Sequence, residues 1–186
     1  MSQEAIEQYA RERNLSIRDA LQTFMQIIVL KNLALPKVRL IGGTALVLGH
    51  GNPRFSEDID LADVTSPALL RPGLAKAGAE LEGWLGFPAT LVPPKRGGRT
   101  WRLVCSVNRS ETLQLHIDCQ EYPAYTAHPI VLQFPTLPTF VFEAAALEEI
   151  MADKVVAVAY RRYLGGRDLF DLWFHWLRSD SWQKRG

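Results

Sequence analysis

The pattern that most constrains the fold is a short apolar strand that ends in two glycines and is followed at once by a helix. Residues 37–41 read as the strand, Gly42 and Gly43 as the turn, and residues 44–48 as the start of the helix. Glycine lacks a Cβ, so a phosphate can approach the backbone amides closely. The helix N-terminus adds unpaired N–H groups, and Thr44 can add a hydroxyl. A Gly-Gly turn alone is weak evidence for a phosphate site.

A second strand, predicted at residues 57–62, carries two aspartates that point the same way. Side chains two residues apart share a face of a strand, so Asp58 and Asp60 project together while Ile59 and Leu61 pack into the core. Adjacent carboxylates raise each other's proton affinity, and a divalent cation would neutralise them. Magnesium binds through a few carboxylates plus substrate phosphates. Solvated aspartates are the alternative reading, but the nearby double-glycine turn favours Asp58 and Asp60 as magnesium ligands.

A third carboxylate lies on the strand predicted at residues 111–119. Apolar residues alternate there with Gln114, His116 and Asp118. Asp118 could therefore aim at the same metals and complete a two-metal site, which activates an attacking oxygen and stabilises a leaving pyrophosphate. The alternative is an exposed strand aspartate. His116 shares that face and is expected to be a polar neighbour of the site, not a ligand.

The C-terminal quarter of the sequence predicts two helices. The first runs from residue 143 to about 161, glycines at 165 and 166 break it, and the second covers residues 167–177. Lys154 could reach a triphosphate as a mobile charge. Asp168 and Asp171 suit a helix N-terminus electrostatically, although their spacing alone is that of ordinary surface residues.

The whole pattern predicts an α/β (α+β) domain, in which a mixed sheet of about five strands is packed by helices. We expect one domain over residues 1–186. It comprises N-terminal helices (1–35, the second capped by Ser16), a sheet core with the motifs (36–142) and C-terminal helices (143–186). Within the core we expect a helix from Ser66-Pro67 to about residue 83, strands at 87–92 and 100–107, and a hairpin turn at 108–110. The proline-rich stretch 122–140 is expected to be loop-like with short extended pieces.

The charge balance excludes a strongly basic surface. The chain has 21 Lys and Arg against 20 Asp and Glu, so a polyanionic partner would need a local patch. Cys105 and Cys119 read as small core residues in a reducing compartment. The charged N-terminus is no signal peptide, and no apolar run reaches the roughly 18–20 residues that span a bilayer. We expect a soluble cytoplasmic protein. Six basic side chains could either contact an RNA backbone or serve only to keep the protein soluble. They are Lys95, Arg96, Arg99, Arg161, Arg162 and Arg167.

These motifs resemble those of the AbiEii/AbiGii nucleotidyltransferase toxin family, within the DNA polymerase β-like superfamily. The segments IGGTAL (41–46) and RFSEDIDL (54–61) carry the resemblance, EIMADK (149–154) is similar to the family's lysine motif, and RDLFDL (167–172) is similar to its final Arg-Asp motif. The matches follow the family's order and span residues about 40–173.

The resemblance implies a minimal nucleotidyltransferase core and roles for individual residues. Asp58 and Asp60 would bind magnesium, with Asp118 as the third ligand that the strand pattern suggests. Asp168 would be an essential acidic residue, and Lys154 would contact the nucleotide. The residues expected to hold the nucleoside triphosphate (NTP) are Gly42, Gly43, Thr44, Ser56 and Lys154.

The resemblance also implies a biological role. Family members are toxins of toxin–antitoxin and phage-defence systems. Some transfer nucleotides to the 3′ end of tRNA, and a cognate antitoxin is commonly encoded beside the toxin. Many relatives have a longer helical C-terminal region that helps to hold the acceptor, whereas this sequence ends soon after the last motif. A small molecule or a protein hydroxyl therefore stays open as acceptor, as does a catalytically inactive nucleotide- or RNA-binding regulator.

Overall fold

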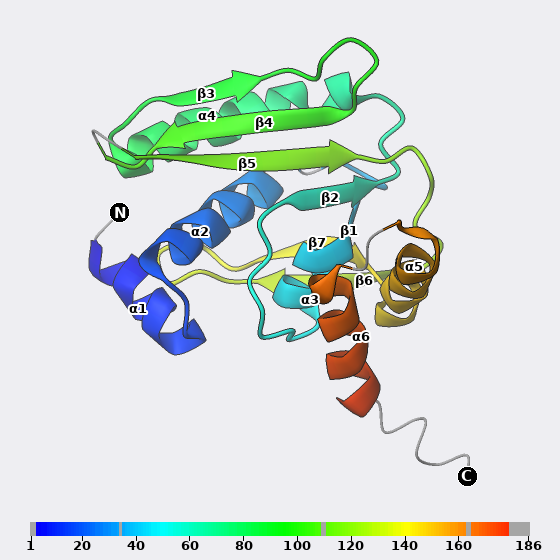
Figure 1. Cartoon of the computed structure of the whole chain (residues 1–186). Coiled ribbons are helices and arrows are strands. Elements are labelled where there is room, and N and C mark those ends of the chain that lie inside the picture. Colours follow the sequence, from blue (N-terminus) through cyan, green and yellow to red (C-terminus); the bar gives the residue numbers. More distant parts are fainter. Residues whose placement is uncertain (1–2, 34, 109–110, 163–164, 179–186) are drawn as a thin grey trace.

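Seven strands form one mixed sheet in the computed structural model, which describes residues 3–33, 35–108, 111–162 and 165–178. Their order across the sheet is β3-β4-β5-β2-β1-β7-β6 (Figure 1). β2 pairs antiparallel with β1 and parallel with β5, which makes the sheet mixed. The strands are β1 (Arg39–Ile41), β2 (Ile59–Ala62), β3 (Ala89–Val92), β4 (Thr100–Ser106), β5 (Thr112–Cys119), β6 (Ala127–Leu132) and β7 (Phe140–Ala145).

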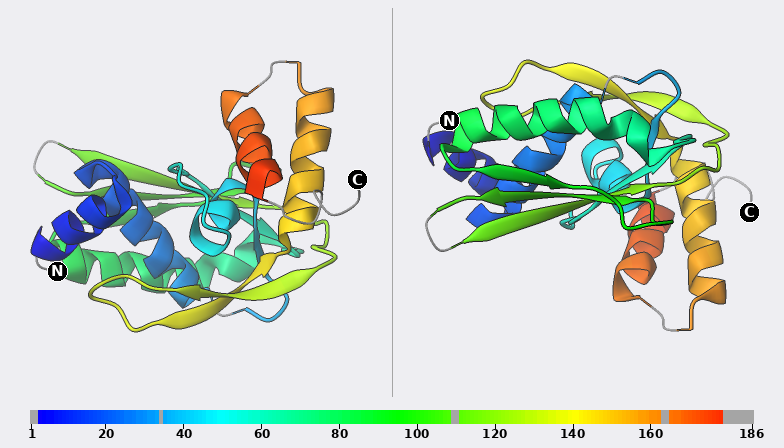
Figure 2. Two further views of the ribbon diagram at one scale, coloured as in Figure 1. Left: turned by 90° about the horizontal axis from the view of Figure 1, so that it is seen from below. Right: turned by 90° about the horizontal axis from the view of Figure 1, so that it is seen from above.

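Helices α2 and α4 pack against each other and against the sheet, whereas α5 and α6 lie side by side and project away from it (Figure 2). The short α3 follows β1 directly and contacts β1, β2 and β6. The helices are α1 (Gln3–Arg13), α2 (Ile17–Asn32), α3 (Gly42–Gly49), a 3-10 turn at Pro67–Leu70, α4 (Arg71–Leu85), α5 (Leu147–Tyr160) and α6 (Gly166–Arg178). No helix among these described residues is long and apolar enough to cross a membrane.

The core forms where the sequence pattern predicts it. In α2, Phe24, Ile27 and Ile28 are almost fully buried, and the Asp19 amide donates to the Ser16 hydroxyl at 3.1 Å, which caps the helix as expected. β5 alternates strictly between buried and more exposed side chains. Cys105 and Cys119 are buried free thiols, and burial raises both pKa values.

Two elements differ from the sequence prediction. The sheet has seven strands instead of about five, because the loop-like stretch 122–140 contains β6 and because Phe140–Ala145 forms β7. Pro129 is tolerated in β6 because this strand lies at the edge of the sheet, where a missing N–H need not break the ladder. The helix predicted from residue 143 begins at Leu147, since Phe140–Ala145 forms β7 between β1 and β6. Part of the predicted 108–110 turn lies outside the described residues.

Candidate active site

The sheet register brings the predicted carboxylates and the double-glycine turn together. Asp60 lies opposite Ile41 on β1 and opposite Asp118 on β5. Gly42 follows Ile41 with a φ of +69°, a conformation that favours glycine. A Cβ placed on Gly42 would lie 2.4 Å from Asp60 Oδ2. Asp60 therefore faces the turn across a narrow gap.

Asp60 is the most perturbed carboxylate of the site. Burial, together with the neighbouring charges of Asp118 and Asp58, raises its pKa to about 6, although Lys154 and Arg161 act in the opposite sense. A carboxylate that resists ionisation beside two others gains from a bound cation. The electrostatics of the three acids therefore suit a site for a divalent metal ion.

Asp58 and Asp118 each have a polar partner. Asp58 Oδ1 lies 3.1 Å from His116 Nδ1, and Asp118 accepts a hydrogen bond from the Thr100 hydroxyl. Across the described ranges, no group of three acidic, histidine or cysteine side chains is arranged as a ready-made metal cage. Magnesium does not need one, because it commonly binds through one or two carboxylates plus phosphates and water. The oxygen donors of Asp58 and Asp60 fit that requirement.

Ser56 and Thr44 have different places in the site. Ser56 lines the cleft beside Gly43, and a Cβ on Gly43 would lie 2.9 Å from its Oγ. The Thr44 side chain is completely buried. Its hydroxyl lies 2.9 Å from Ser56 Oγ and also contacts the carbonyl of Asp58. Thr44 thus ties α3 to the segment that enters β2, and its hydroxyl does not face the cleft.

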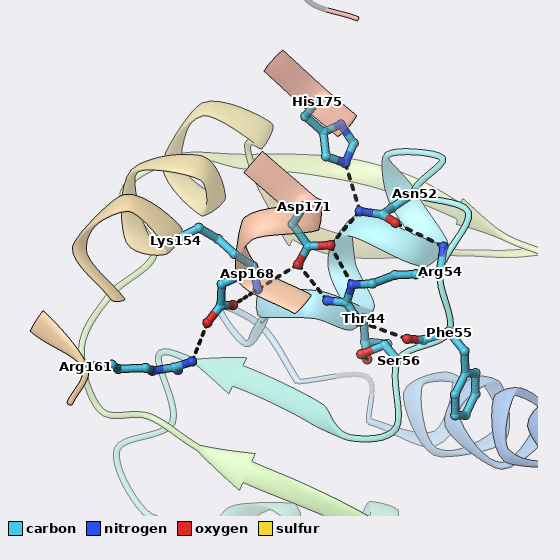
Figure 3. Close-up of polar contacts among 10 residues, drawn as sticks. All are labelled: Thr44, Asn52, Arg54, Phe55, Ser56, Lys154, Arg161, Asp168, Asp171 and His175. Atoms are coloured by element: carbon cyan, nitrogen blue, oxygen red, sulfur yellow. Dashed lines mark hydrogen bonds and ion pairs between the residues drawn. The ribbon is translucent and has the colours of Figure 1, made fainter. Parts of the chain in front are cut away.

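Lys154 and Asp168 form an ion pair between α5 and α6 (Figure 3). Lys154 Nζ lies 2.6 Å from Asp168 Oδ1 and 2.9 Å from Asp171 Oδ2, and Arg161 contacts the other oxygen of Asp168. The spacing had suggested surface positions for both aspartates, yet both are buried, because α6 folds back against α5. Lys154 is only 11% exposed and is held in place, in contrast to the mobile charge expected from the sequence.

The sequence did not predict a second polar cluster, which adjoins the Lys154–Asp168 pair through Asp171. Arg54 grips Asp171 with two hydrogen bonds, from Nε at 2.5 Å and from Nη2 at 2.7 Å. Asn52 Nδ2 also donates to Asp171, at 2.8 Å, and lies 3.4 Å from His175 Nε2. Burial opposes ionisation of Asp171, but the hydrogen bonds from Arg54 and Lys154 outweigh it and lower its pKa. The available signal was the spacing of residues 168, 171 and 175, which places three polar side chains on one helical face.

Two cavities meet over these residues and together form a cleft between the sheet and the α5–α6 pair. We call them the tyrosine end, of about 570 Å³, and the arginine end, of about 460 Å³. Both volumes are in the range of ligand sites. A third cavity, of about 440 Å³, lies against His116 and the far side of Asp58. The residues that line both ends of the cleft are Gly43, Asp60, Lys154, Arg161 and Asp168.

Solved structures with a similar fold include a nucleotidyltransferase toxin. MenT4, a nucleotidyltransferase toxin from Mycobacterium tuberculosis H37Rv, superposes with a TM-score of 0.68 at 22% identity; the match covers 96% of this chain and 65% of that chain. JHP933 from Helicobacter pylori gives a TM-score of 0.58 at 23% identity, and the match covers 90% of this chain and 69% of that chain. At these identities the matches establish the shared fold. A search of curated protein sequences found no significant match.

A protein-family comparison extends the likeness from fold to family. The model described as "Nucleotidyl transferase AbiEii toxin, Type IV TA system" matches residues 23–178. The matched range includes the double-glycine turn, the three acids Asp58, Asp60 and Asp118, and the Lys154–Asp168 pair. It also covers most of the chain. The chain therefore belongs to the AbiEii nucleotidyl transferase toxin family of type IV toxin–antitoxin systems.

Proposed function

We propose that this chain is a magnesium-dependent nucleotidyltransferase, which transfers a nucleoside monophosphate from an NTP to RNA, such as the 3′ end of a tRNA. The observation that carries the proposal is the position of Asp60, which faces Gly42 within a cleft large enough for a nucleotide and has Asp58 and Asp118 close enough to act on its charge. Family membership supports the reaction class and a cognate antitoxin as partner. We expect the protein to act in the cytoplasm.

The residues divide the chemistry between them. Asp58 and Asp60 would hold magnesium, with Asp118 as a further oxygen donor. Bound magnesium would neutralise phosphate charge and stabilise in-line displacement of pyrophosphate. The amides of the Gly42–Gly43 turn and the Ser56 hydroxyl would face the triphosphate. The positive charges of Lys154 and Arg161, which line both ends of the cleft, would attract it.

The RNA acceptor is supported by the position of the β3–β4 turn. β4 begins at Thr100, which pairs with Asp118, so this turn lies at the same end of the sheet as the acids. Lys95 and Arg96 in this turn are available for an RNA backbone. Arg99 is not, because it donates to the carbonyls of Cys119 and Val64 and lies 3.6 Å from Glu121.

Label transfer with purified protein tests the reaction. We expect label from an α-phosphate-labelled NTP, but not from a γ-labelled one, to appear on total tRNA when magnesium is present. Asp58→Asn and chelation by EDTA should each abolish it. Label on a small molecule or a protein, and none on RNA, would move the acceptor to those classes. Calorimetric NTP binding without transfer to any acceptor would refute the enzymatic proposal and indicate a nucleotide-binding regulator.

A glycine pair provides a test of the turn geometry. Gly42 and Gly51 both have positive φ, of +69° and +68°, but only Gly42 has a neighbour that an added Cβ would strike. Either alanine variant should lose about 1–2 kcal/mol of unfolding free energy from backbone strain. Gly42→Ala should in addition displace the Asp60 carboxylate and lower kcat/KM about 100-fold, whereas Gly51→Ala should keep the wild-type kcat/KM. Urea denaturation and label transfer measure the two effects; equal kcat/KM values in the two variants would contradict this geometry.

A further inference from the structure

The two ends of the cleft differ in chemistry. Beyond the residues that both share, the arginine end adds Arg54 and Arg167 together with Glu57 and Asp58. Arg167 already pairs with Glu57. The tyrosine end adds no cation, and its one additional charge is the carboxylate of Asp153. The added charges of the arginine end cancel, whereas the added charge of the tyrosine end is negative, so a triphosphate is repelled less at the arginine end, beside the shared Lys154.

The tyrosine end offers groups that suit a flat, polar ring. Tyr122 is 52% exposed and lines this end with Gln120, Ile150 and Ala157. Aromatic side chains stack on nucleobases of every kind. Within the part of the chain that the structure describes, no side chain forms a hydrogen bond with the Asp153 carboxylate or the Gln120 amide. Both groups are therefore available to the edge of a base.

The chain beyond β5 brings Gln120 and Tyr122 into the cavity that Asp60 lines. The strand ends before Gln120, and the chain bends at Tyr122. The Gln120 amide donates to the Leu61 carbonyl, and the carbonyls of Gln120 and Tyr122 accept from the amides of Val64 and Asp63, so this segment stays hydrogen-bonded to β2 and the residues that follow it. Gln120 and Tyr122 line the same cavity as Asp60. A nucleotide whose α-phosphate lies at the acids can thus extend its base towards Tyr122.

We propose that the tyrosine end binds the nucleobase of the donor NTP and selects for bases that carry an exocyclic amino group. This inference rests on the proposed function. Tyr122 stacks on the base, and the Asp153 carboxylate accepts a hydrogen bond from the amino group of cytosine, adenine or guanine. Uracil is disfavoured because carbonyl oxygens flank its only N–H and repel a carboxylate. The Gln120 amide can donate to a ring nitrogen or carbonyl of the base.

The test measures binding without turnover, using magnesium and the α,β-methylene analogues of ATP, CTP, GTP and UTP in titration calorimetry. The wild-type protein should bind amino-bearing analogues more tightly than the uridine analogue. Asp153→Asn should weaken the preferred analogue about tenfold or more, the usual scale for a hydrogen bond to a charged group, and leave the uridine analogue unchanged or tighter. Tyr122→Ala should weaken all four analogues at least fivefold through lost stacking.

A charge-matched control separates base recognition from a general field effect. Glu148→Gln removes one negative charge from an exposed position of the same helix, outside the cleft, and should change no affinity. If Asp153→Asn shifts all four analogues equally, or alters only the KM of the acceptor, the base assignment is overturned while the transferase proposal stands. If the wild-type protein binds none of the analogues, the proposed function falls and this inference falls with it.

Discussion

Asp60→Asn is expected to make the metal-free protein more stable at pH 7.5 and to abolish nucleotidyl transfer. The folded protein holds the pKa of Asp60 at about 6, against an ordinary value of 3.8 for an aspartate. Ionising this group in the fold therefore costs up to about 3 kcal/mol relative to the unfolded chain. Asparagine removes this cost and also removes the oxygen charge that magnesium requires. Loss of one such ligand should lower kcat/KM at least about a thousandfold.

The stability difference between Asp60→Asn and the wild type should depend on pH, because only the wild type can bind a proton at residue 60. Between about pH 4 and pH 6 the folded state binds a proton at Asp60 that the unfolded state has already lost, so the stability of the wild-type protein falls as pH rises through this range. Above about pH 6 the cost is complete and constant. The variant lacks this titration, so its advantage should be near zero at pH 4 and largest at neutral pH.

Urea denaturation in EDTA at a series of pH values measures the effect. Glu148→Gln, at an exposed position on α5, should stay within about 0.5 kcal/mol of the wild type throughout. Magnesium with an NTP analogue should then raise the Tm of the wild type and not that of Asp60→Asn. An Asp60→Asn protein that is less stable than the wild type at pH 7.5 would show that the carboxylate is not under electrostatic stress.

Short-range geometry explains why the acid face and the glycine turn could be predicted from the sequence. The alternation of Asp58, Ile59 and Asp60 fixes which side chains share a face of the strand. Gly42 and Gly43 mark a turn that residues with a Cβ cannot easily form. Only the register of β1, β2 and β5, which is a tertiary property, decides that these groups converge.

The missed features depend on contacts between distant segments. Pro129 argued against a strand, but β6 lies at the sheet edge, and the sequence does not say which strand will be an edge. Asp168 and Asp171 read as helix-start residues because their burial depends on how α6 turns back against α5. Arg54 is separated from Asp171 by 117 residues, so no local pattern could pair them. Thr44 looked like a phosphate ligand because its hydroxyl's internal partners are not visible in sequence.

Asp171→Ala is expected to be the most destabilising single change in the site, with a loss of about 3–5 kcal/mol of unfolding free energy at pH 7.5. Asp171 is fully buried and neutralises Arg54, whose side chain is 14% exposed. Removing the acid leaves this guanidinium buried without its carboxylate, and also removes the hydrogen bond that Asn52 donates to Asp171. Because the fold lowers the pKa of Asp171, its contribution is present at neutral pH and is lost as pH falls through the folded pKa.

A double-mutant cycle separates the buried charge from simple loss of packing. Arg54→Met combined with Asp171→Ala should lose at least about 2 kcal/mol less than the sum of the single losses, because the double variant leaves neither partner charged alone. Lys154 also pairs with Asp168, at 2.6 Å in the wild-type protein, so we expect it to add no new unpaired charge in these variants. The control is Arg167→Gln, which breaks an ion pair whose side chains are 63% and 54% exposed and should cost less than about 1 kcal/mol. Additive losses in urea denaturation would mean that Arg54 and Asp171 are not coupled, and that α6 is held in place by its apolar contacts instead.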